Sequence, residues 1–139
     1  MSFSNSPKIE VAAAIISNEN DEVLCMQRGL NKYSYISKKY EFPGGKIEPG
    51  ETIENALIRE IDEEINLDIE IDGLFLKVEH LYPDFFLIMH AYKCKTKSLN
   101  IVLNEHIAYK WLPFKSLNDL DWAAADIPIV KKLMIDAIK

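Results

Sequence analysis

Four acidic side chains stand close together in the sequence: Glu60, Asp62, Glu63 and Glu64. The apolar residues around them recur three and four positions apart, which predicts an amphipathic helix over 52–65. At about 100° per residue, Glu60 and Glu64 fall inside the apolar arc of that helix, and Glu63 falls at its edge. We therefore expect three of the four carboxylates to turn partly toward the protein interior.

Carboxylates that turn inward need a cation among them. Like charges four positions apart on a helix repel each other, and a desolvated carboxylate without a partner is unfavourable. Carboxylate oxygen suits Mg²⁺ or Mn²⁺, ions that favour sites shared with substrate phosphates. The alternative is a solvated acidic face, the usual meaning of an acidic run. That alternative fits Asp62 but fits Glu60 and Glu64 poorly.

The segment before this helix can expose its backbone to a ligand, because glycine makes a backbone conformationally free. It contains three of the five glycines of the chain: Gly44, Gly45 and Gly50. Thr52 is a suitable N-cap, since its hydroxyl can accept a hydrogen bond from the amide of Asn55. Arg59 lies beside Glu63 on the helix surface, so the angles alone favour a structural ion pair for this arginine.

The rest of the chain alternates between strand and helix patterns. Five segments are rich in β-branched and aromatic residues or alternate at period two, which predicts strands: 11–17, 23–27, 67–78, 85–94 and 108–112. A second amphipathic helix is predicted over 127–138. This order of elements predicts an α+β fold with a mixed β-sheet between helices.

The composition, with 48% hydrophobic and 27% charged residues over 139 positions, predicts a single globular domain spanning 1–139. A net charge of −6 argues against a nucleic-acid polymer as partner, because that binding depends on neutralising phosphates. Cys25 and Cys94 lie in apolar runs, where thiols are usually buried and reduced. Without a signal-peptide pattern or a membrane-spanning run, we expect a cytoplasmic monomer or homodimer with no membrane partner.

The acidic helix and the residues before it resemble the Nudix box, G-x5-E-x7-R-E-U-x-E-E-x-G-U, where U is a bulky aliphatic residue. The matching residues are Gly45, Glu51, Arg59, Glu60, Ile61, Glu63, Glu64 and Leu67. The one departure is Asn66, where the family has glycine. Asparagine adopts the left-handed conformation more readily than most residues, so we expect the helix to end normally there and activity to survive.

The resemblance implies a Nudix fold, an α/β/α sandwich, and hydrolysis of a nucleoside diphosphate linked to another group. It implies Mg²⁺ as cofactor, with Mn²⁺ able to take its place. The implied metal ligands are Glu60, Glu63, Glu64 and the carbonyl of Gly44 or Gly45. Glu51 and Arg59 would orient the ligand carboxylates. In the family, water attacks a phosphorus atom of the pyrophosphate bridge, and magnesium neutralises the developing charge and activates the water.

Glu105 occupies the place of the glutamate that is a metal ligand and the proposed general base in MutT-like members. We therefore expect Glu105 to act in catalysis together with Glu60 and Glu64, although the residue alone would be interpreted as an exposed loop acid. The adjacent His106 is predicted to be an ordinary solvated loop histidine. The same prediction is made for the other two histidines, His80 and His90.

Segments 11–16 and 122–128, with Arg28, also resemble MutT and the related CTP pyrophosphohydrolases. The resemblance places Arg28 and Lys46 near the phosphates and Asp126 at the edge of the base. An ionised aspartate is only an acceptor. It can receive hydrogen bonds from the exocyclic amine of cytosine, or from N1–H and the 2-amino group of guanine or 8-oxoguanine, but it matches thymine or uracil O4 poorly.

These substrate contacts have local alternatives. Asp126 could simply cap the last helix, with Pro128 in its first turn. Arg28 could be a surface cation at the end of a strand. Three aromatic residues could stack on a base, although aromatic residues near strands more often belong to the core: Tyr33, Tyr35 and Phe85.

The sequence therefore predicts a magnesium-dependent nucleoside triphosphate pyrophosphohydrolase that releases nucleoside monophosphate and pyrophosphate. The leading substrates are (d)CTP-type nucleotides and oxidised guanine nucleotides such as 8-oxo-dGTP. An alternative activity is hydrolysis of another nucleoside diphosphate derivative, such as ADP-ribose or a dinucleoside polyphosphate. A catalytically silent nucleotide sensor is the alternative of a different class, against which the intact acidic residues argue.

Overall fold

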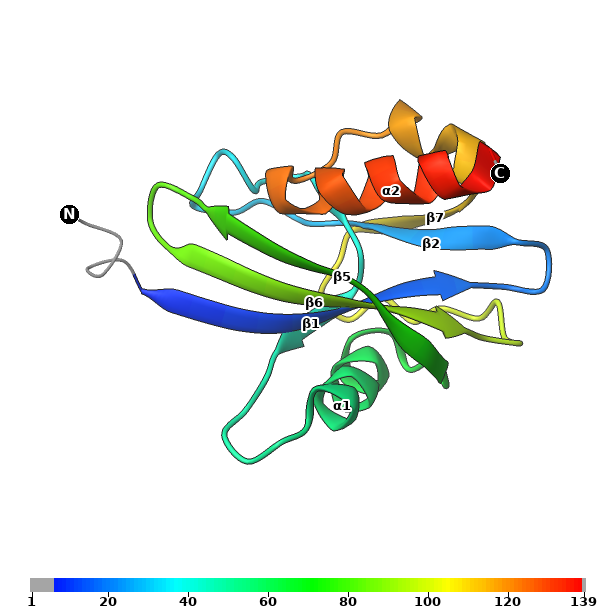
Figure 1. Cartoon of the computed structure of the whole chain (residues 1–139), viewed down its shortest axis with the longest axis horizontal. Helices are drawn as coiled ribbons and strands as arrows, with labels where there is room; N and C mark the ends of the chain where they lie inside the picture. Colours follow the sequence, from blue (N-terminus) through cyan, green and yellow to red (C-terminus); the bar gives the residue numbers. More distant parts are fainter. Residues whose placement is uncertain (1–6, 139) are drawn as a thin grey trace.

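The computed structural model describes residues 7–138, which form a mixed β-sheet between two helices (Figure 1). The strands are β1 (Lys8–Ser17), β2 (Glu22–Gln27), β3 (Tyr40–Glu41), β4 (Gly44–Lys46), β5 (Glu70–Leu81), β6 (Phe86–Lys95) and β7 (Ala108–Pro113). The helices are α1 (Ile53–Ile65) and α2 (Ile127–Ile138). Two 3₁₀ turns precede α2: η2 (Phe114–Asp119) and η3 (Ala124–Asp126).

Strand β1 is central to the sheet. It pairs in parallel with β6, from Lys8 opposite Phe86 to Ser17 opposite Lys95, and it pairs antiparallel with β2 and β4. Strand β5 continues the sheet beyond β6, while β3 and β7 both pair with β2. The sheet therefore mixes parallel and antiparallel pairing, as predicted.

The two faces of β1 belong to two separate cores. Ala12 and Ile16 pack in the cluster beneath α1, whereas Ala13 and Ile15 pack in the cluster beneath α2. A strand that is covered on both faces has no polar side, which explains the uninterrupted apolar run at 11–16. The predicted α+β sandwich, with helices on opposite faces of a mixed sheet, is confirmed (Figure 1).

Helix α1 begins and ends where the sequence predicts. The Thr52 hydroxyl accepts a hydrogen bond from the amide of Asn55 at 3.1 Å. Asn66 adopts the left-handed conformation, with φ 53° and ψ 48°, and its amide donates to the carbonyl of Asp62. The residue that departs from the family pattern therefore supplies the same helix end that a glycine would.

Some boundaries differ from the prediction. The strand predicted over 67–78 is β5, which starts at Glu70, because Leu67 is buried in the core beneath α1 rather than paired in the sheet. Strands β3 and β4 and the two 3₁₀ turns were not predicted. Strands of two or three residues are defined by their pairing with β2 and β1, which no local pattern shows. Within residues 7–138, neither helix is long and apolar enough to cross a membrane.

Candidate active site

Helix α1 buries its carboxylates to different extents. Glu64 is 3% exposed, Glu60 is half-buried, and Glu63 and Asp62 are exposed. The helical angles predicted this order, because Glu60 and Glu64 share the arc that carries the apolar side chains into the sheet. The inward orientation of Glu60 and Glu64 is confirmed, whereas the expectation that Glu63 also turns partly inward is wrong, because its side chain is 58% exposed at the edge of the apolar arc.

Strand β4 brings a glycine backbone directly against these carboxylates. A Cβ atom at position 45 would overlap the carboxylate of Glu60. A Cβ at position 44 would overlap the carbonyl of Ala12 in β1. Gly45 thus permits a close approach of the β4 backbone to the Glu60 carboxylate, and Gly44 permits a close approach of β4 to β1.

Arg59 links several of the carboxylates. Its Nε and Nη2 donate to the two carboxylate oxygens of Glu51 at 2.7 and 2.8 Å. Its Nη1 donates to Glu60 at 3.0 Å and to Glu63 at 3.3 Å, and Nη2 also reaches the carbonyl of Lys46 at 3.1 Å. The hydrogen bonds from Arg59 lower the pKa of Glu51 to about 2. Arg59 and Glu51 therefore lie beside the expected metal ligands.

Glu64 forms no salt bridge within residues 7–138, although the charge of Arg28 acts on it from a greater distance. Burial, followed by the negative charges of Glu41, Glu105 and Glu60, raises the pKa of Glu64 to about 8. Its Oε2 is buried and has no hydrogen-bond partner within residues 7–138. Burial also raises the pKa of Glu60, although Arg59 opposes this shift. An unpartnered carboxylate oxygen among other acids is where a divalent cation would be favourable.

The carboxylates are not yet arranged as a complete coordination sphere. No group of three His, Cys, Asp or Glu side chains in residues 7–138 is set to hold a metal ion, and Glu60 and Glu63 bond to Arg59 instead. The donor chemistry nevertheless fits a hard divalent ion, since it consists of carboxylate and backbone oxygens with one orphaned oxygen at Glu64.

One cavity of about 760 Å³ brings most of the predicted site residues together. It is lined by Glu60, Glu63, Glu64, Glu105, Gly44, Gly45, Arg28, Lys46 and Arg59, among others. Glu105 is exposed and reaches this cavity from the connection between β6 and β7, whereas Glu51 lies behind Arg59. We call this space the carboxylate cavity.

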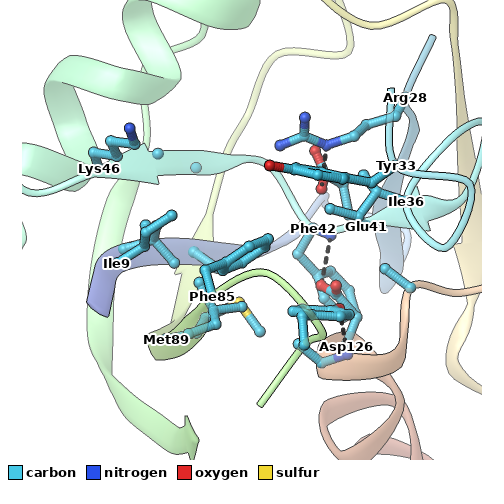
Figure 2. Close-up of a pocket in the computed structure, with 18 of the residues that line it drawn as sticks. Ile9, Arg28, Tyr33, Ile36, Glu41, Phe42, Lys46, Phe85, Met89 and Asp126 are labelled. Carbon is cyan, nitrogen blue, oxygen red and sulfur yellow. Dashed lines mark hydrogen bonds and ion pairs between the residues drawn. The ribbon is translucent and has the colours of Figure 1, made fainter. Parts of the chain in front are cut away.

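A second cavity of about 390 Å³ adjoins it and is more apolar (Figure 2). Arg28, Glu41 and the segment 44–46 line both cavities. Figure 2 shows Tyr33, Phe85 and Met89 around this second space, with Asp126 deeper in it. We call it the apolar cavity.

Asp126 is buried in the apolar cavity. Its Oδ1 accepts a hydrogen bond from the amide of Phe42 at 3.1 Å. No hydrogen bond from an α2 amide to its carboxylate is found within residues 7–138, so the alternative of a helix cap is not observed. Burial, followed by the charge of Glu41, raises the pKa of Asp126 well above its usual value.

Four aromatic rings form a closed cluster on one side of the apolar cavity: Tyr33, Tyr35, Tyr82 and Phe85. Tyr33, Tyr82 and Phe85 line the cavity, while Tyr35 packs against the core and its hydroxyl donates to Asp84. Of the three aromatic residues that could stack on a base, Tyr33 and Phe85 are therefore accessible to a ligand, whereas Tyr35 has a structural role.

The prediction of solvated histidines is wrong for two of the three. His106 is buried, and its Nε2 lies 2.8 Å from Glu41 Oε2. His90 is buried and lies 2.6 Å from Glu10 Oε2, and His80 is half-buried against the ring of Tyr82. A loop histidine becomes buried only when the fold brings it a distant partner, which a local pattern does not reveal.

Glu41 is the functional candidate that the sequence reasoning missed. It accepts hydrogen bonds from Arg28 Nε at 2.9 Å and from His106, and it lines both cavities. Burial alone would raise its pKa, but the bonds from His106 and Arg28 lower it overall. Glu41 stands directly before Phe42-Pro43-Gly44. The signal that could have identified Glu41 in the sequence is a charged residue at the start of a glycine-containing turn.

Comparison with known proteins agrees with this geometry. A model of the NUDIX domain matches residues 7–133. The 8-oxo-dGTP diphosphatase of Escherichia coli (strain K12) is 33% identical over 126 residues, covering 91% of this chain and 96% of that protein. The CTP pyrophosphohydrolase of the same strain is 27% identical over 126 residues, 91% of each chain. The crystal structure of the MutT protein from Methanosarcina mazei Go1 has the same fold, with a TM-score of 0.86 at 23% identity over 97% of this chain and 99% of that chain.

Proposed function

This chain belongs to the Nudix hydrolase family, and we propose that it is a magnesium-dependent nucleoside triphosphate pyrophosphohydrolase. It would release nucleoside monophosphate and pyrophosphate from (d)CTP-type nucleotides or from oxidised guanine nucleotides such as 8-oxo-dGTP. The observation that carries this proposal is the pair of adjoining cavities, one lined with carboxylates and one apolar with a buried acid. The charged triphosphate of a nucleotide needs a polar, metal-binding environment, which the carboxylate cavity would provide. The flat base needs a largely apolar one, which the apolar cavity would provide.

The carboxylate cavity would hold the metal and the phosphates. Glu60, Glu63, Glu64, Glu105 and the carbonyl of Gly44 would be the ligands. When bound, Mg²⁺, or Mn²⁺ in its place, supplies charge neutralisation and activation of water. Glu105 would accept a proton from the attacking water, because it is exposed and can reach solvent, whereas the exposed Glu63 is bonded to Arg59.

The cationic residues of this cavity have separate tasks. Arg28 and Lys46 would bind phosphate oxygens at the border between the two cavities, which they both line. Arg28 is held by Glu41 and is still half-exposed, so its remaining donors are free to point at a ligand. Arg59 and Glu51 would orient the carboxylates of α1, since Arg59 bonds to Glu51, Glu60 and Glu63.

The apolar cavity would hold the base, with Asp126 at its polar edge. An ionised Asp126 accepts from the amine of cytosine or from the N–H groups of guanine. A protonated Asp126, which burial favours, offers one donor as well and could pair with the N3 and amine of cytosine together. Tyr33 and Phe85 would contact the faces of the base. The nucleotide itself is the proposed partner of a cytoplasmic monomer or homodimer.

A nucleotide panel tests this function, with chromatographic identification of the products for every substrate and pyrophosphate release for the triphosphates as the readouts. The panel contains the common ribo- and deoxyribonucleoside triphosphates, 8-oxo-dGTP, ADP-ribose and a dinucleoside polyphosphate, each with Mg²⁺ and with EDTA. We expect metal-dependent pyrophosphate release that is fastest with cytidine or 8-oxoguanine nucleotides. Faster turnover of ADP-ribose or the dinucleoside would overturn the substrate class. Binding without any turnover would make the protein a sensor.

A further inference from the structure

The loop that carries Glu105 also completes the end of helix α1. The last carbonyls of a helix lack partners within the helix. Here the amide of Asn104 donates to the carbonyl of Glu64 at 3.2 Å, and its side-chain Nδ2 donates to the carbonyl of Glu63 at 2.8 Å. The amide of Val102 donates to the carbonyl of Ile65 at 3.1 Å. The residue before Glu105 is therefore bound to the backbone of two expected metal ligands.

The residue after Glu105 is bound on the opposite side of the cavity. The His106 side chain is 4% exposed, and its Nε2 lies 2.8 Å from Glu41 Oε2. The next amide, of Ile107, donates to the carbonyl of Gln27 at 3.0 Å. Glu41 is itself held by Arg28. This attachment therefore joins the loop to β2 and β3, as the other joins it to α1.

Glu105 lies between these two attachments and has none of its own. No hydrogen bond or ion pair of its side chain is found within residues 7–138, and it is exposed. An exposed loop residue is free to move unless its backbone is held. A displacement of about 1 Å at a reacting group can lower the rate by about 100-fold. The position of the Glu105 side chain in the carboxylate cavity therefore depends on how its two neighbours are held.

We propose that Asn104 and His106 are positioning residues that hold Glu105 at the carboxylate cavity, Asn104 by binding the end of α1 and His106 by binding Glu41. The proposal rests on the proposed function, in which Glu105 is a metal ligand and base. Neither Asn104 nor His106 takes part in the reaction itself. Their contribution is to set the distance between Glu105 and the carboxylates of α1 before any ligand arrives.

Kinetics of single and double variants test this assignment. Asn104→Ala and His106→Leu should each lower kcat by about 10- to 100-fold while changing KM less than about twofold, because substrate contacts stay intact. His106→Gln should recover most of the rate, since its amide can still donate to Glu41. Asn100→Ala, at an exposed asparagine of the same loop, is the matched control and should keep the wild-type rate.

The double variants separate positioning from general destabilisation. In a Glu105→Gln background, Asn104→Ala and His106→Leu should lower kcat no further, because they act through Glu105. Additive losses in that background would overturn the proposal. A wild-type rate for Glu105→Gln alone would instead remove Glu105 from the proposed mechanism, and the positioning roles with it.

Two measurements on the protein do not depend on turnover. Mn²⁺ titration followed by electron paramagnetic resonance should show affinity weakened about 10-fold in Asn104→Ala and His106→Leu, with no further loss in Glu105→Gln double variants. Hydrogen exchange of the metal-free protein should show the Ile107 amide losing protection in His106→Leu and keeping it in His106→Gln. Unchanged Mn²⁺ affinity together with unchanged exchange would overturn the proposal even if the protein hydrolysed no nucleotide.

Discussion

Glu64 is costly to the fold because its Oε2 is buried without a hydrogen-bond partner among the described residues 7–138. Its two carboxylate neighbours, Glu60 and Glu63, are at least bonded to Arg59. A buried carboxylate without a counter-charge lowers stability unless a cation or a proton joins it. At the scale of single residues, the unfavourable burial of the Glu64 carboxylate is therefore best explained by the cation that the proposed function places there.

Replacing Glu64 by glutamine keeps the shape and removes a carboxylate whose ionisation is made unfavourable by burial. We expect Glu64→Gln to lower kcat by about 100-fold or more and to raise the melting temperature of the metal-free protein. Steady-state kinetics and thermal unfolding in EDTA measure the two effects. A wild-type rate would exclude Glu64 from the metal site, and a lower melting temperature would contradict the unpaired charge.

Asp126 has a folded-state pKa well above its usual value because it is buried near Glu41. Below the unfolded pKa of about 3.9, Asp126 is protonated in both states and costs nothing. As pH rises through that value, the unfolded chain releases the proton and the folded protein keeps it, so the wild type loses stability until pH passes the folded pKa. Asp126→Asn should therefore gain stability over wild type as pH rises from 4 to 8. A difference in unfolding free energy that is constant with pH would show that Asp126 is not perturbed.

Base recognition gives Asp126 a separate test. Asp126→Ala should change the order of preference among bases more than it changes the rate on the poorest substrate, because the phosphates bind elsewhere. The measurement is kcat/KM across the nucleotide panel. An unchanged order would leave Asp126 as a structural ligand of the Phe42 amide and nothing more.

At the scale of elements, the site depends on how closely β4 approaches α1. The backbone of Gly45 lies against the carboxylate of Glu60, where a Cβ would overlap it. Glu60 is the flexible end of a side chain, so it can move aside at little cost to the fold. Under the proposed function, catalysis needs Glu60 in place, whereas the stability of the fold does not.

Gly45→Ala should therefore lower kcat by about 10- to 100-fold while changing the melting temperature little. Gly73→Ala is the matched control, since a Cβ at position 73 in β5 meets no atom within 4 Å, and it should keep the wild-type rate. Kinetics and thermal unfolding of the two variants give the comparison. Equal rates for both would mean that Glu60 tolerates displacement and is not a tightly held ligand.

At the scale of the whole molecule, the sheet separates two cores, and each contains one cysteine. Cys25 packs in the cluster beneath α2 and Cys94 in the cluster beneath α1. Burial raises the pKa of both thiols to about 12, so neither forms the reactive thiolate at neutral pH. The prediction that both cysteines are buried is confirmed.

Both thiols should be inert to Ellman's reagent in the folded protein and should react together on unfolding. If the two cores unfold as one cooperative unit, thiol reactivity in a urea titration should rise in a single transition that coincides with loss of circular dichroism. Reaction of one thiol before the other would show that one face of the sheet opens independently.

The sequence by itself determined the features that arise from short-range geometry. The helical period turned Glu60 and Glu64 inward, Thr52 started the helix, and Asn66 ended it in the left-handed conformation. These outcomes depend on neighbours three or four positions away, which a sequence displays directly. The α+β layering followed from the order of such elements and from the run at 11–16 that is apolar on both faces.

Only the tertiary structure decided which distant residues meet. Glu41 meets His106 across 65 positions, and Phe42 meets Asp126 across 84. His106 was expected in solvent because nothing near it in the chain is its partner. Contacts of this kind form when the strands pair and close the core, so their identity depends on the register of the sheet, and no local pattern of side chains contains that register.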